Sequence, residues 1–209
     1  MKLASSSFDD GGAIPAQFAF CAPDAKIHAT LSKNLNPHLA WSEVPPGTKS
    51  FALLCHDPDV PSKGDDVNQE GRVVPKSLPR VDFFHWVLVD LPPTQAGVGL
   101  GEYSSSVVAR GKPGPQAPRG ARHGINDYTA WFASDAGMSG DYYGYDGPCP
   151  PWNDEMPHRY VFTVYALDVA RLPLEGRFGG AQVREALARH VLAQAAITGR
   201  YTLNPAVKV

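Results

Sequence analysis

The sequence predicts a mainly β protein, and two observations carry this prediction. Glycine and proline contribute 20 residues each to a chain of 209, and without a repeat to explain them they belong in turns between strands. Three apolar segments also have the composition of strands, namely 50–55, 83–91 and 160–169. The third is apolar almost without interruption, which is typical of a strand covered on both faces.

One helix is predicted, from Gln182 to about Ala196. Apolar residues recur there with helical spacing at Val183, Leu187, Val191, Leu192 and Ala195. Gly199 would follow the end of the helix, where glycine is common. We expect this helix to pack on the sheet and to take no part in chemistry.

Composition restricts the class of protein. The length suits one domain, 1–209, with 43% apolar and 19% charged residues. The formal net charge of −2 argues against a nucleic-acid binder with a broad basic face. No apolar run approaches the length of about 20 residues that a membrane span needs, and Asp9 and Asp10 argue against a secretory signal.

The three cysteines, Cys21, Cys55 and Cys149, are widely spaced and form no CxxC pair. An odd number in this arrangement indicates free thiols in a reducing compartment, with one disulfide as the alternative. We therefore expect a cytoplasmic protein.

The residues between the second and third strands form two contrasting halves. The first half, 110–124, has no acid and contains the basic residues Arg110, Lys112, Arg119 and Arg122. We interpret it as a solvated turn or, alternatively, as a loop that attracts anions. The second half, 125–157, has no lysine or arginine and is rich in acids and aromatic residues. Its aromatic content argues against disorder, and loops of this length within a domain are commonly functional.

Asp57 and Asp59 are the first candidates for a binding site. They alternate with prolines in the sequence DPDVP, directly after the first strand. Residues before proline avoid helical geometry, so we interpret the segment as a stiff, extended turn. The two acids are either ordinary turn formers or a pair in which one carboxylate orients a histidine and the other bonds its own loop.

His85 is the second candidate, because it interrupts an apolar strand. A buried histidine needs a hydrogen-bond partner, which is either a backbone carbonyl or a ligand. Strand alternation places His85 on the face of Phe83 and Val87, opposite Phe84 and Trp86.

The third candidate combines a glycine-proline segment with the start of the third strand. Gly147 allows a close backbone approach to a ligand, and Pro148 stiffens the wall. Alternation puts His158 and Tyr160 on one face and Arg159 on the other, where we expect a salt bridge to a loop acid.

The same residues also bring two other kinds of chemistry into question. Asp57, His85 and His158 resemble metal ligands in type, but they lack the short fixed spacing of a metal motif. We expect neither a metal nor a cofactor. Cys149 as a nucleophile with His158 as its base lacks an adjacent cation or helix N-terminus to activate the thiol.

Six segments occur in a specific order: NLNPHLAW, VPPGTKSFALLCHDPDVP, FFHWVLVDLP, GINDY, GYDGPCPP and HRYVFTVYALD. In this order they resemble the phosphatidylethanolamine-binding protein family, also called Raf-kinase-inhibitor-like proteins. The tail VREALARHVLAQAAITGRY is similar to the bacterial branch. The resemblance extends from about Phe8 to Tyr201.

The resemblance implies an antiparallel β-sandwich-like domain, with a large central sheet, a smaller sheet, a C-terminal helix and a few short flanking helices. It also implies a small pocket for phosphate-like head groups. The positions that match the family's pocket are Asp57, His85, Gly147, Pro148, His158 and Tyr160. Supporting positions are Pro58, Asp59, Trp86 and Arg159.

Two segments depart from the family pattern as insertions, 128–144 and 152–157. Both border the implied pocket, so they affect its size and its choice of ligand. Their large aromatic residues are Trp131, Tyr142, Tyr143 and Trp152. We expect these residues either to form an aromatic lid or to pack the insertion onto the domain or a partner subunit.

These observations favour a protein that binds a small anion, such as a phosphate or a phospholipid head group, and that modulates a protein partner such as a kinase or a protease. The alternative is a small hydrolase that uses Asp57, His85 and His158 as acid and base. The bacterial branch also allows a homodimer. We expect anion binding to weaken as pH rises through the histidine pKa values.

Overall fold

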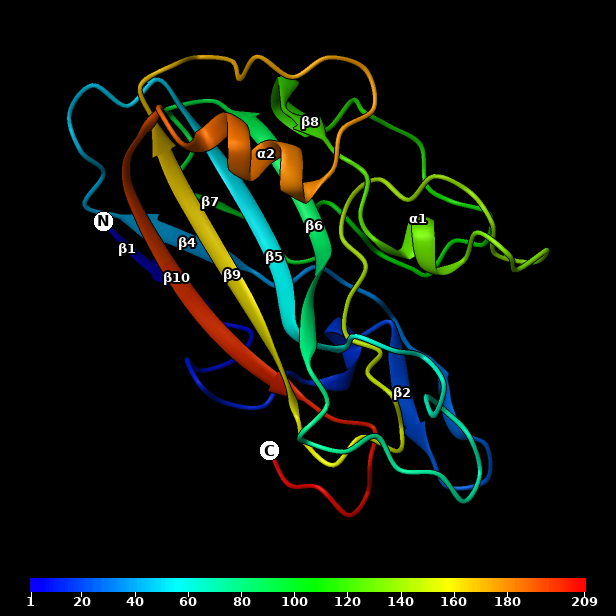
Figure 1. Ribbon diagram of the computed structural model, residues 1–209. Helices are drawn as coiled ribbons and strands as arrows, with labels where there is room; N and C mark the ends of the chain where they lie inside the picture. The colour runs from blue at the N-terminus through cyan, green and yellow to red at the C-terminus, as the bar shows by residue number, and fades with distance from the viewer.

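The computed structural model describes residues 1–209 and consists mainly of antiparallel β-strands (Figure 1). The strands are β1 (Lys2–Ala4), β2 (Cys21–Asp24), β3 (His28–Leu31), β4 (Leu39–Ser42), β5 (Ser50–Pro61), β6 (Arg80–Leu91), β7 (Gly97–Val98), β8 (Arg122–His123), β9 (His158–Leu167) and β10 (Val191–Tyr201). The helices are α1 (Tyr128–Trp131) and α2 (Gly180–Leu187), with short 3₁₀ turns η1 (Ala16–Phe18) and η2 (Pro118–Gly120). The prediction of a mainly β protein is confirmed.

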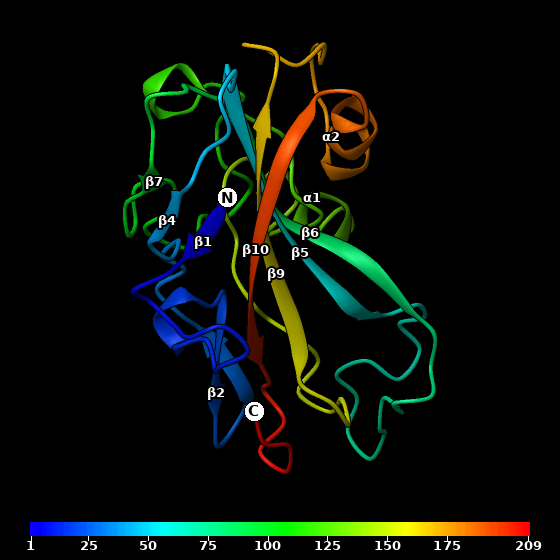
Figure 2. The ribbon, with the colours of Figure 1, turned by 90° about the vertical axis from the view of Figure 1, so that its left-hand side faces the viewer.

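A five-stranded sheet in the order β10–β9–β5–β6–β8 forms the centre of the molecule, and all neighbouring strands in it are antiparallel. A three-stranded sheet, β1–β4–β7, lies on one side of it, and α2 lies on the other (Figure 2). The hairpin β2–β3 forms a separate third sheet. The large and the smaller sheet of the predicted sandwich are therefore present, with one sheet more than expected.

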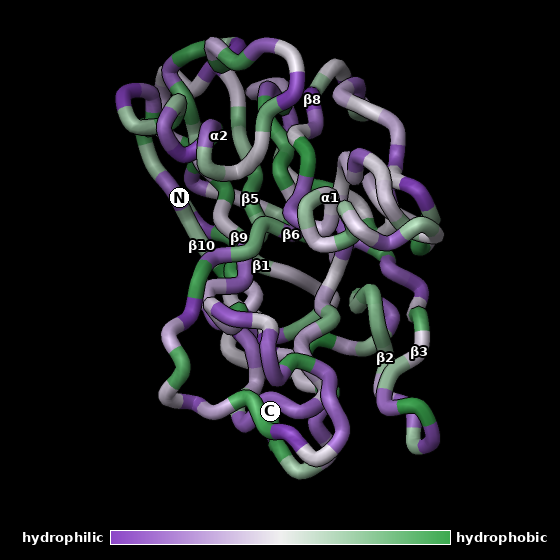
Figure 3. The backbone as a smooth tube through the Cα atoms, turned by 45° about the vertical axis from the view of Figure 1, so that its right-hand side comes forward, coloured by the Kyte–Doolittle hydropathy of each residue, from purple (hydrophilic) through white to green (hydrophobic).

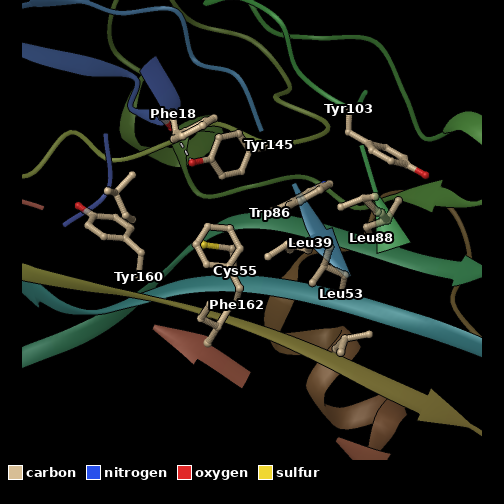
Figure 4. Close-up of a cluster of buried hydrophobic side chains, with 14 of the residues drawn as sticks. Phe18, Leu39, Leu53, Cys55, Trp86, Leu88, Tyr103, Tyr145, Tyr160 and Phe162 are labelled. Atoms are coloured by element: carbon tan, nitrogen blue, oxygen red, sulfur yellow. Dashed lines mark hydrogen bonds between the residues drawn. The ribbon is translucent and has the colours of Figure 1, made fainter. Parts of the chain in front are cut away.

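The central strands are buried on both faces, as their apolar sequences predict. Along β5, Leu53 faces a large core that includes Trp86 and Phe162 (Figure 4). The next residue, Leu54, faces a smaller core that Val183 of α2 helps to close. Hydrophobic residues, green in Figure 3, are concentrated along these strands. The period of two in their burial is that of a β-strand.

The DPDVP sequence lies within β5, which continues to Pro61. Its extended geometry was predicted correctly, but the turn was not, because β6 is long enough to pair with this segment. Asp57 pairs with Phe83 and Val60 pairs with Val81, and the extra residue between the two pairs forms a β-bulge. Asp57 is consequently held in a sheet and not in a turn.

The helix predicted over 182–196 is wrong in its second half and is not the C-terminal element. α2 ends at Leu187, and Val191–Tyr201 forms β10, which pairs with β9. Alternate residues of 193–201 are the less exposed ones, a strand period that an alanine-rich sequence conceals because alanine also favours helices. Gly199 lies inside this strand and ends no helix. Neither helix is long and apolar enough to cross a membrane.

Two of the three cysteines form a disulfide, Cys21–Cys149, so the expectation of free thiols is wrong for this pair. The two residues are 128 positions apart, and no short-range pattern indicates that they meet. Cys55 is a free thiol within the large core. Because disulfides are typical of oxidising compartments, the cysteines no longer support the reducing, cytoplasmic environment that was expected.

The assignment of β10 as a strand predicts unequal effects of two alanine substitutions. Ile197 is 4% exposed, whereas Leu192 is 43% exposed. Ile197→Ala should lower the free energy of unfolding by about 2–4 kcal/mol, and Leu192→Ala by less than about 1 kcal/mol. Urea unfolding of both variants measures the difference. A larger loss for Leu192, which a continuous helix would bury, would contradict the strand.

Candidate ligand-binding site

A cavity of about 440 Å³ lies where the ends of β5, β6 and β9 meet the β2–β3 hairpin and α1. Because the three strands are antiparallel neighbours, the C-terminal half of β5 adjoins the N-terminal ends of β6 and β9. This register brings Asp57, His85, His158 and Tyr160 to the lining of the cavity. Residues that are far apart in the sequence thus meet in one place.

A β-bulge in β6 sets the direction of His85. Cys55 of β5 pairs with Trp86, but the next residue, His56, pairs with Phe84, so His85 is the extra residue. Two successive side chains then project to the same side of the sheet. His85 lines the cavity, Trp86 lies in the large core on that side, and Phe84 lies in the smaller core. The expectation that Phe84 and Trp86 share a face is wrong, and Trp86 contributes by packing.

His158 is held between two carboxylates. Its Nδ1 is 2.7 Å from Asp57 Oδ2, and its Nε2 is 3.1 Å from Asp154 Oδ2, so both ring nitrogens donate and the ring is an imidazolium. Burial opposes this charge, but the two carboxylates outweigh it and raise the pKa of His158 to about 9. Arg80 donates to the same Asp154 oxygen at 2.5 Å. His158 therefore has no ring nitrogen free for a ligand.

Asp57 and Asp59 bond to different partners and together join β5 to β9. Asp57 Oδ1 accepts the backbone N–H of Asp59 at 2.8 Å, which leaves Oδ2 for His158. Pro58 between them fixes the local backbone angle. The carboxylate of Asp59 accepts from the guanidinium of Arg159 at 2.7 and 2.8 Å and from its backbone N–H at 2.9 Å. The predicted salt bridge of Arg159 is confirmed, but its acid lies in β5 and not in a loop.

His85 and Tyr160 have polar atoms without a partner. His85 Nδ1 is 2.7 Å from the carbonyl oxygen of Asp146, and because a carbonyl only accepts, Nδ1 carries the proton. His85 Nε2 and the Tyr160 hydroxyl are buried and make no hydrogen bond. The hydroxyl points away from the hydrophobic residues beside it (Figure 4). The two rings lie edge to face, with their centroids 5.1 Å apart.

The two histidines of the site differ in charge: His158 is positive and His85 is neutral near neutral pH. Burial lowers the pKa of His85 to about 4, although Asp57 and the Asp146 carbonyl act in the other direction. Burial also raises the pKa of Tyr160 well above its ordinary value. Near neutral pH the cavity thus contains a neutral imidazole that accepts through Nε2 and a neutral phenol that donates.

The network that positions Asp146 was missed by the sequence analysis. Asp146 Oδ1 accepts from Asn34 at 2.7 Å and from Lys112 at 2.9 Å, and Oδ2 accepts from Asn126 at 2.7 Å. The available signal was the set of polar residues in the short motifs NLNP, GIND and GYDG, which contain Asn34, Asn126 and Asp146. All three residues are buried in the structure. Asp154 was missed as well, since it lies in a segment interpreted only as a longer connection.

The basic segment 110–124 is not a solvated turn throughout. Lys112 pairs with Asp146, and Arg122 pairs with Asp90 at 2.5 Å, and both pairs are largely buried. These two cations have structural partners inside the protein. The exposed Arg110 and Arg119 fit the expected surface position, and Arg119 pairs with the half-buried Glu102.

Gly147 and Pro148 do not line the cavity, whereas Cys149 and the two prolines after it do. Gly147 packs so closely on Phe18 that a Cβ would lie 2.1 Å from the Phe18 carbonyl oxygen. The carbonyl of Pro148 accepts from the N–H of Cys21 at 3.1 Å. The glycine-proline pair therefore supports the wall from behind, and the disulfide is part of the wall itself.

The insertion at 128–144 forms one side of the cavity, and the remaining sides are also largely apolar. The lining residues of the insertion are Tyr128, Trp131, Phe132 and Met138. Apolar residues of the other sides include Phe20, Leu31, Val60 and Phe83. Among the four aromatic residues of the expected lid, Trp131 is the one that lines the cavity, and 53% of its surface is exposed.

The other three aromatic residues of the expected lid lie elsewhere. Tyr142 is fully buried in the large core, so it packs the insertion onto the domain. Tyr143 packs against Gly114. Trp152 stacks on His28, with the ring centroids 3.8 Å apart. A lid built from all four residues is therefore wrong, and packing is the correct alternative for these three.

The fold and the site define a β-rich ligand-binding protein with a largely apolar cavity that contains a few polar groups. Comparison with known proteins gives this class a family. A model of the family described as phosphatidylethanolamine-binding protein matches residues 4–202. The chain belongs to the phosphatidylethanolamine-binding protein family.

Relatives of similar length support this assignment. The UPF0098 protein YbhB of Escherichia coli K12 is 32% identical over 202 residues, which cover 97% of this chain and 100% of that protein. A UPF0098 protein of Methanothermobacter thermautotrophicus is 33% identical and covers 96% of this chain and 98% of its own length. The crystal structure of E. coli YbcL, described as a new member of the mammalian PEBP family, is similar with a TM-score of 0.67 and 27% identity, over 96% and 97% of the two chains.

The charged state of His158 predicts how stability depends on pH. Its folded pKa of about 9 exceeds the ordinary value of 6.5, so the stabilisation is complete below the ordinary value and is lost as pH rises through the folded one. The difference corresponds to about 3 kcal/mol. We expect Asp57→Asn to remove much of this pH-dependent part and to lower the free energy of unfolding by about 3 kcal/mol near neutral pH.

Urea unfolding at about pH 6 and about pH 10 measures this effect, and an NMR titration of the His158 ring gives its pKa directly. Asp168→Asn is the matched control, because Asp168 pairs with the partly exposed His190 at 2.9 Å. The same pH dependence in the wild type and in Asp57→Asn would contradict the assignment.

Proposed function

We propose that the protein binds a small phosphate-bearing ligand, such as a phosphate ester or a phospholipid head group, in this cavity. The observation that carries the proposal is a pair of polar atoms, His85 Nε2 and the Tyr160 hydroxyl, buried without partners on residues that line the cavity. Leaving such atoms unpaired costs about 1–3 kcal/mol each. A ligand that pairs with both recovers this cost. The family's name agrees with this chemistry, because phosphatidylethanolamine carries a phosphate group.

The charges around the cavity favour a ligand whose binding brings a proton. No lysine or arginine lines the cavity, and the charge of His158 is already compensated by Asp57 and Asp154. The lone pair of His85 Nε2 suits the P–OH group of a monoanionic phosphate ester. A dianionic ester, or a diester without a P–OH group, binds in the same way when His85 takes up the proton. Tyr160 then donates to a second phosphate oxygen.

The apolar lining favours an ester over free phosphate. Hydrophobic residues make up 12 of the 20 that line the cavity, and a free phosphate would leave these walls in contact with water. An apolar or aromatic substituent on the phosphate would bury them, at roughly 25 cal/mol for each Å² removed from water. The insertion provides much of this surface, so it is the part of the chain that selects the substituent.

Catalysis by the same residues is the weaker alternative. No serine or threonine lines the cavity, and its two cysteines form the Cys21–Cys149 disulfide, so the usual nucleophiles are missing. A histidine with a pKa of about 4, as for His85, is also a weak general base near neutral pH. Both observations favour binding without turnover.

The proposed site predicts that the affinity for a phosphate monoester depends on pH. An anion beside His85 raises its pKa above the free value of about 4, so binding takes up a proton. The affinity should fall about tenfold for each pH unit between the free and the bound pKa of His85. Calorimetric titration with phosphoethanolamine over this range measures the affinity, and the same titration in two buffers of different ionisation enthalpy counts the protons.

His85→Gln should abolish this binding, whereas His190→Gln, at a partly exposed histidine outside the cavity, should leave it unchanged. Glycerophosphoethanolamine, inorganic phosphate and acetate in parallel titrations separate monoester, diester, free phosphate and simple carboxylate. An affinity that does not change with pH, or full binding by His85→Gln, would reject the proposal. Release of phosphate by the wild type and not by His85→Gln would replace binding with catalysis.

The insertion predicts a separate effect on the choice of substituent. Trp131→Ala should weaken binding of phenyl phosphate by about tenfold, because an aromatic contact is lost, and should leave phosphoethanolamine binding nearly unchanged. Tyr143→Ala is the matched control, since Tyr143 belongs to the same insertion but does not line this cavity. Equal losses for both ligands in Trp131→Ala would contradict a role in selecting the substituent.

A further inference from the structure

A second cavity, of about 290 Å³, is lined by the loop 101–106, by Lys112 and by His123 of β8. It shares no lining residue with the first cavity. Only 3 of its 13 lining residues are hydrophobic, in contrast to 12 of 20 in the first. An apolar ligand would therefore leave most of the polar groups that line this cavity without partners.

His123, which lines this cavity, has a buried polar atom without a partner. The residue is 5% exposed, and its Nδ1 makes no hydrogen bond. Burial, together with the nearby charge of Lys112, lowers the pKa of His123 to about 4, so the ring is neutral near neutral pH. A neutral imidazole offers one donor and one acceptor. As with His85 in the first cavity, leaving the buried nitrogen unpaired costs free energy that a ligand can recover.

The charged groups of the second cavity already have partners. Lys112 Nζ is 2.9 Å from Asp146 Oδ1 and also donates to the carbonyl of Tyr145. An ammonium has three N–H groups, so one remains for a ligand. Glu102 pairs with Arg119 at 2.9 Å. A charged ligand would find no unpaired counter-charge here, and its desolvation would go uncompensated.

We propose that the second cavity binds a small uncharged molecule rich in hydroxyl groups, of the sugar or polyol class. A hydroxyl both donates and accepts, so it pairs with His123 in either tautomer and accepts from Lys112. The exposed Ser105 and Ser106 extend this polar wall. Tyr143 adds an aromatic side chain, a surface on which the C–H groups of a sugar ring pack. The volume is suited to one small ligand.

NMR titration of the intact protein with glucose, with glycerol and with inorganic phosphate tests this proposal. Glucose or glycerol should cause saturable shifts of the His123 ring and of the amides in 101–106, and phosphate should not cause them. Ser106→Leu, which narrows the cavity from an exposed position, and His123→Gln should each weaken binding by about tenfold. Ser139→Leu, on an exposed part of the insertion outside the cavity, should leave binding unchanged.

Two outcomes overturn the proposal. One is that neither glucose nor glycerol causes saturable shifts at the cavity, and the other is that only phosphate does. The Ser106→Leu variant keeps the test decisive if His123→Gln fails to fold. His85→Gln should bind glucose or glycerol as the wild type does, so the result is independent of the function proposed for the first cavity.

Discussion

The buried ion pair between Asp146 and Lys112 is the interaction on which both cavities depend. Its atoms are 2.9 Å apart, and the two side chains are 0% and 9% exposed. Burial raises the pKa of Asp146 and lowers that of Lys112, and the attraction between them opposes both effects.

The backbone of Asp146 exchanges two hydrogen bonds with His85. The Asp146 carbonyl accepts from His85 Nδ1, and the Asp146 N–H donates to the His85 carbonyl. One residue therefore fixes the tautomer of His85 in the first cavity and the position of the ammonium in the second. Loss of either member of the pair would leave a buried charge without a partner, which is more costly than replacing both.

The geometry of the first cavity follows from backbone pairing before any side chain is considered. Antiparallel register places one half of β5 beside the starts of β6 and β9, and alternation then directs Asp57, His158 and Tyr160 to the same side. His85 reaches that side because of the bulge opposite Cys55 and His56. The bulge also moves Trp86 into the large core, so the same backbone irregularity both turns His85 toward the cavity and packs the residue after it. A regular strand would turn one of these two side chains to the opposite face.

Short-range patterns explain what the sequence could predict, and long-range pairing explains what it could not. The continuous apolar runs of β5, β6 and β9 were sufficient to identify the central strands, and strand parity placed His158, Tyr160 and Arg159 correctly. Three features depended on contacts between distant segments: the Cys21–Cys149 disulfide, the bulge at His85, and the pairing of β10 with β9. The second half of the predicted helix failed because the alanines of this segment favour a helix by intrinsic propensity, whereas pairing with β9 makes it a strand. The buried asparagines around Asp146 were recognisable as motif residues, but only the folded chain shows which carboxylate they bond.

Of the two histidines at the first cavity, one is charged and one is neutral near neutral pH, so His85 is the histidine that could change its charge when a ligand binds. His158 cannot change its charge near neutral pH, because Asp57 and Asp154 hold its pKa at about 9, and both of its nitrogens are occupied. His85 sits in the same lining with a pKa of about 4 and one free nitrogen. If both rings were charged, a free anion of any kind would be attracted, and water and buffer ions would compete with the ligand. If both were neutral, Asp57 would repel every anion from the cavity. In the proposed complex one ring stays paired to the carboxylates and the other is neutral until a ligand binds. The negative charge of that ligand and the proton on His85 would then enter the site together, and selectivity would come from the groups that can supply the proton.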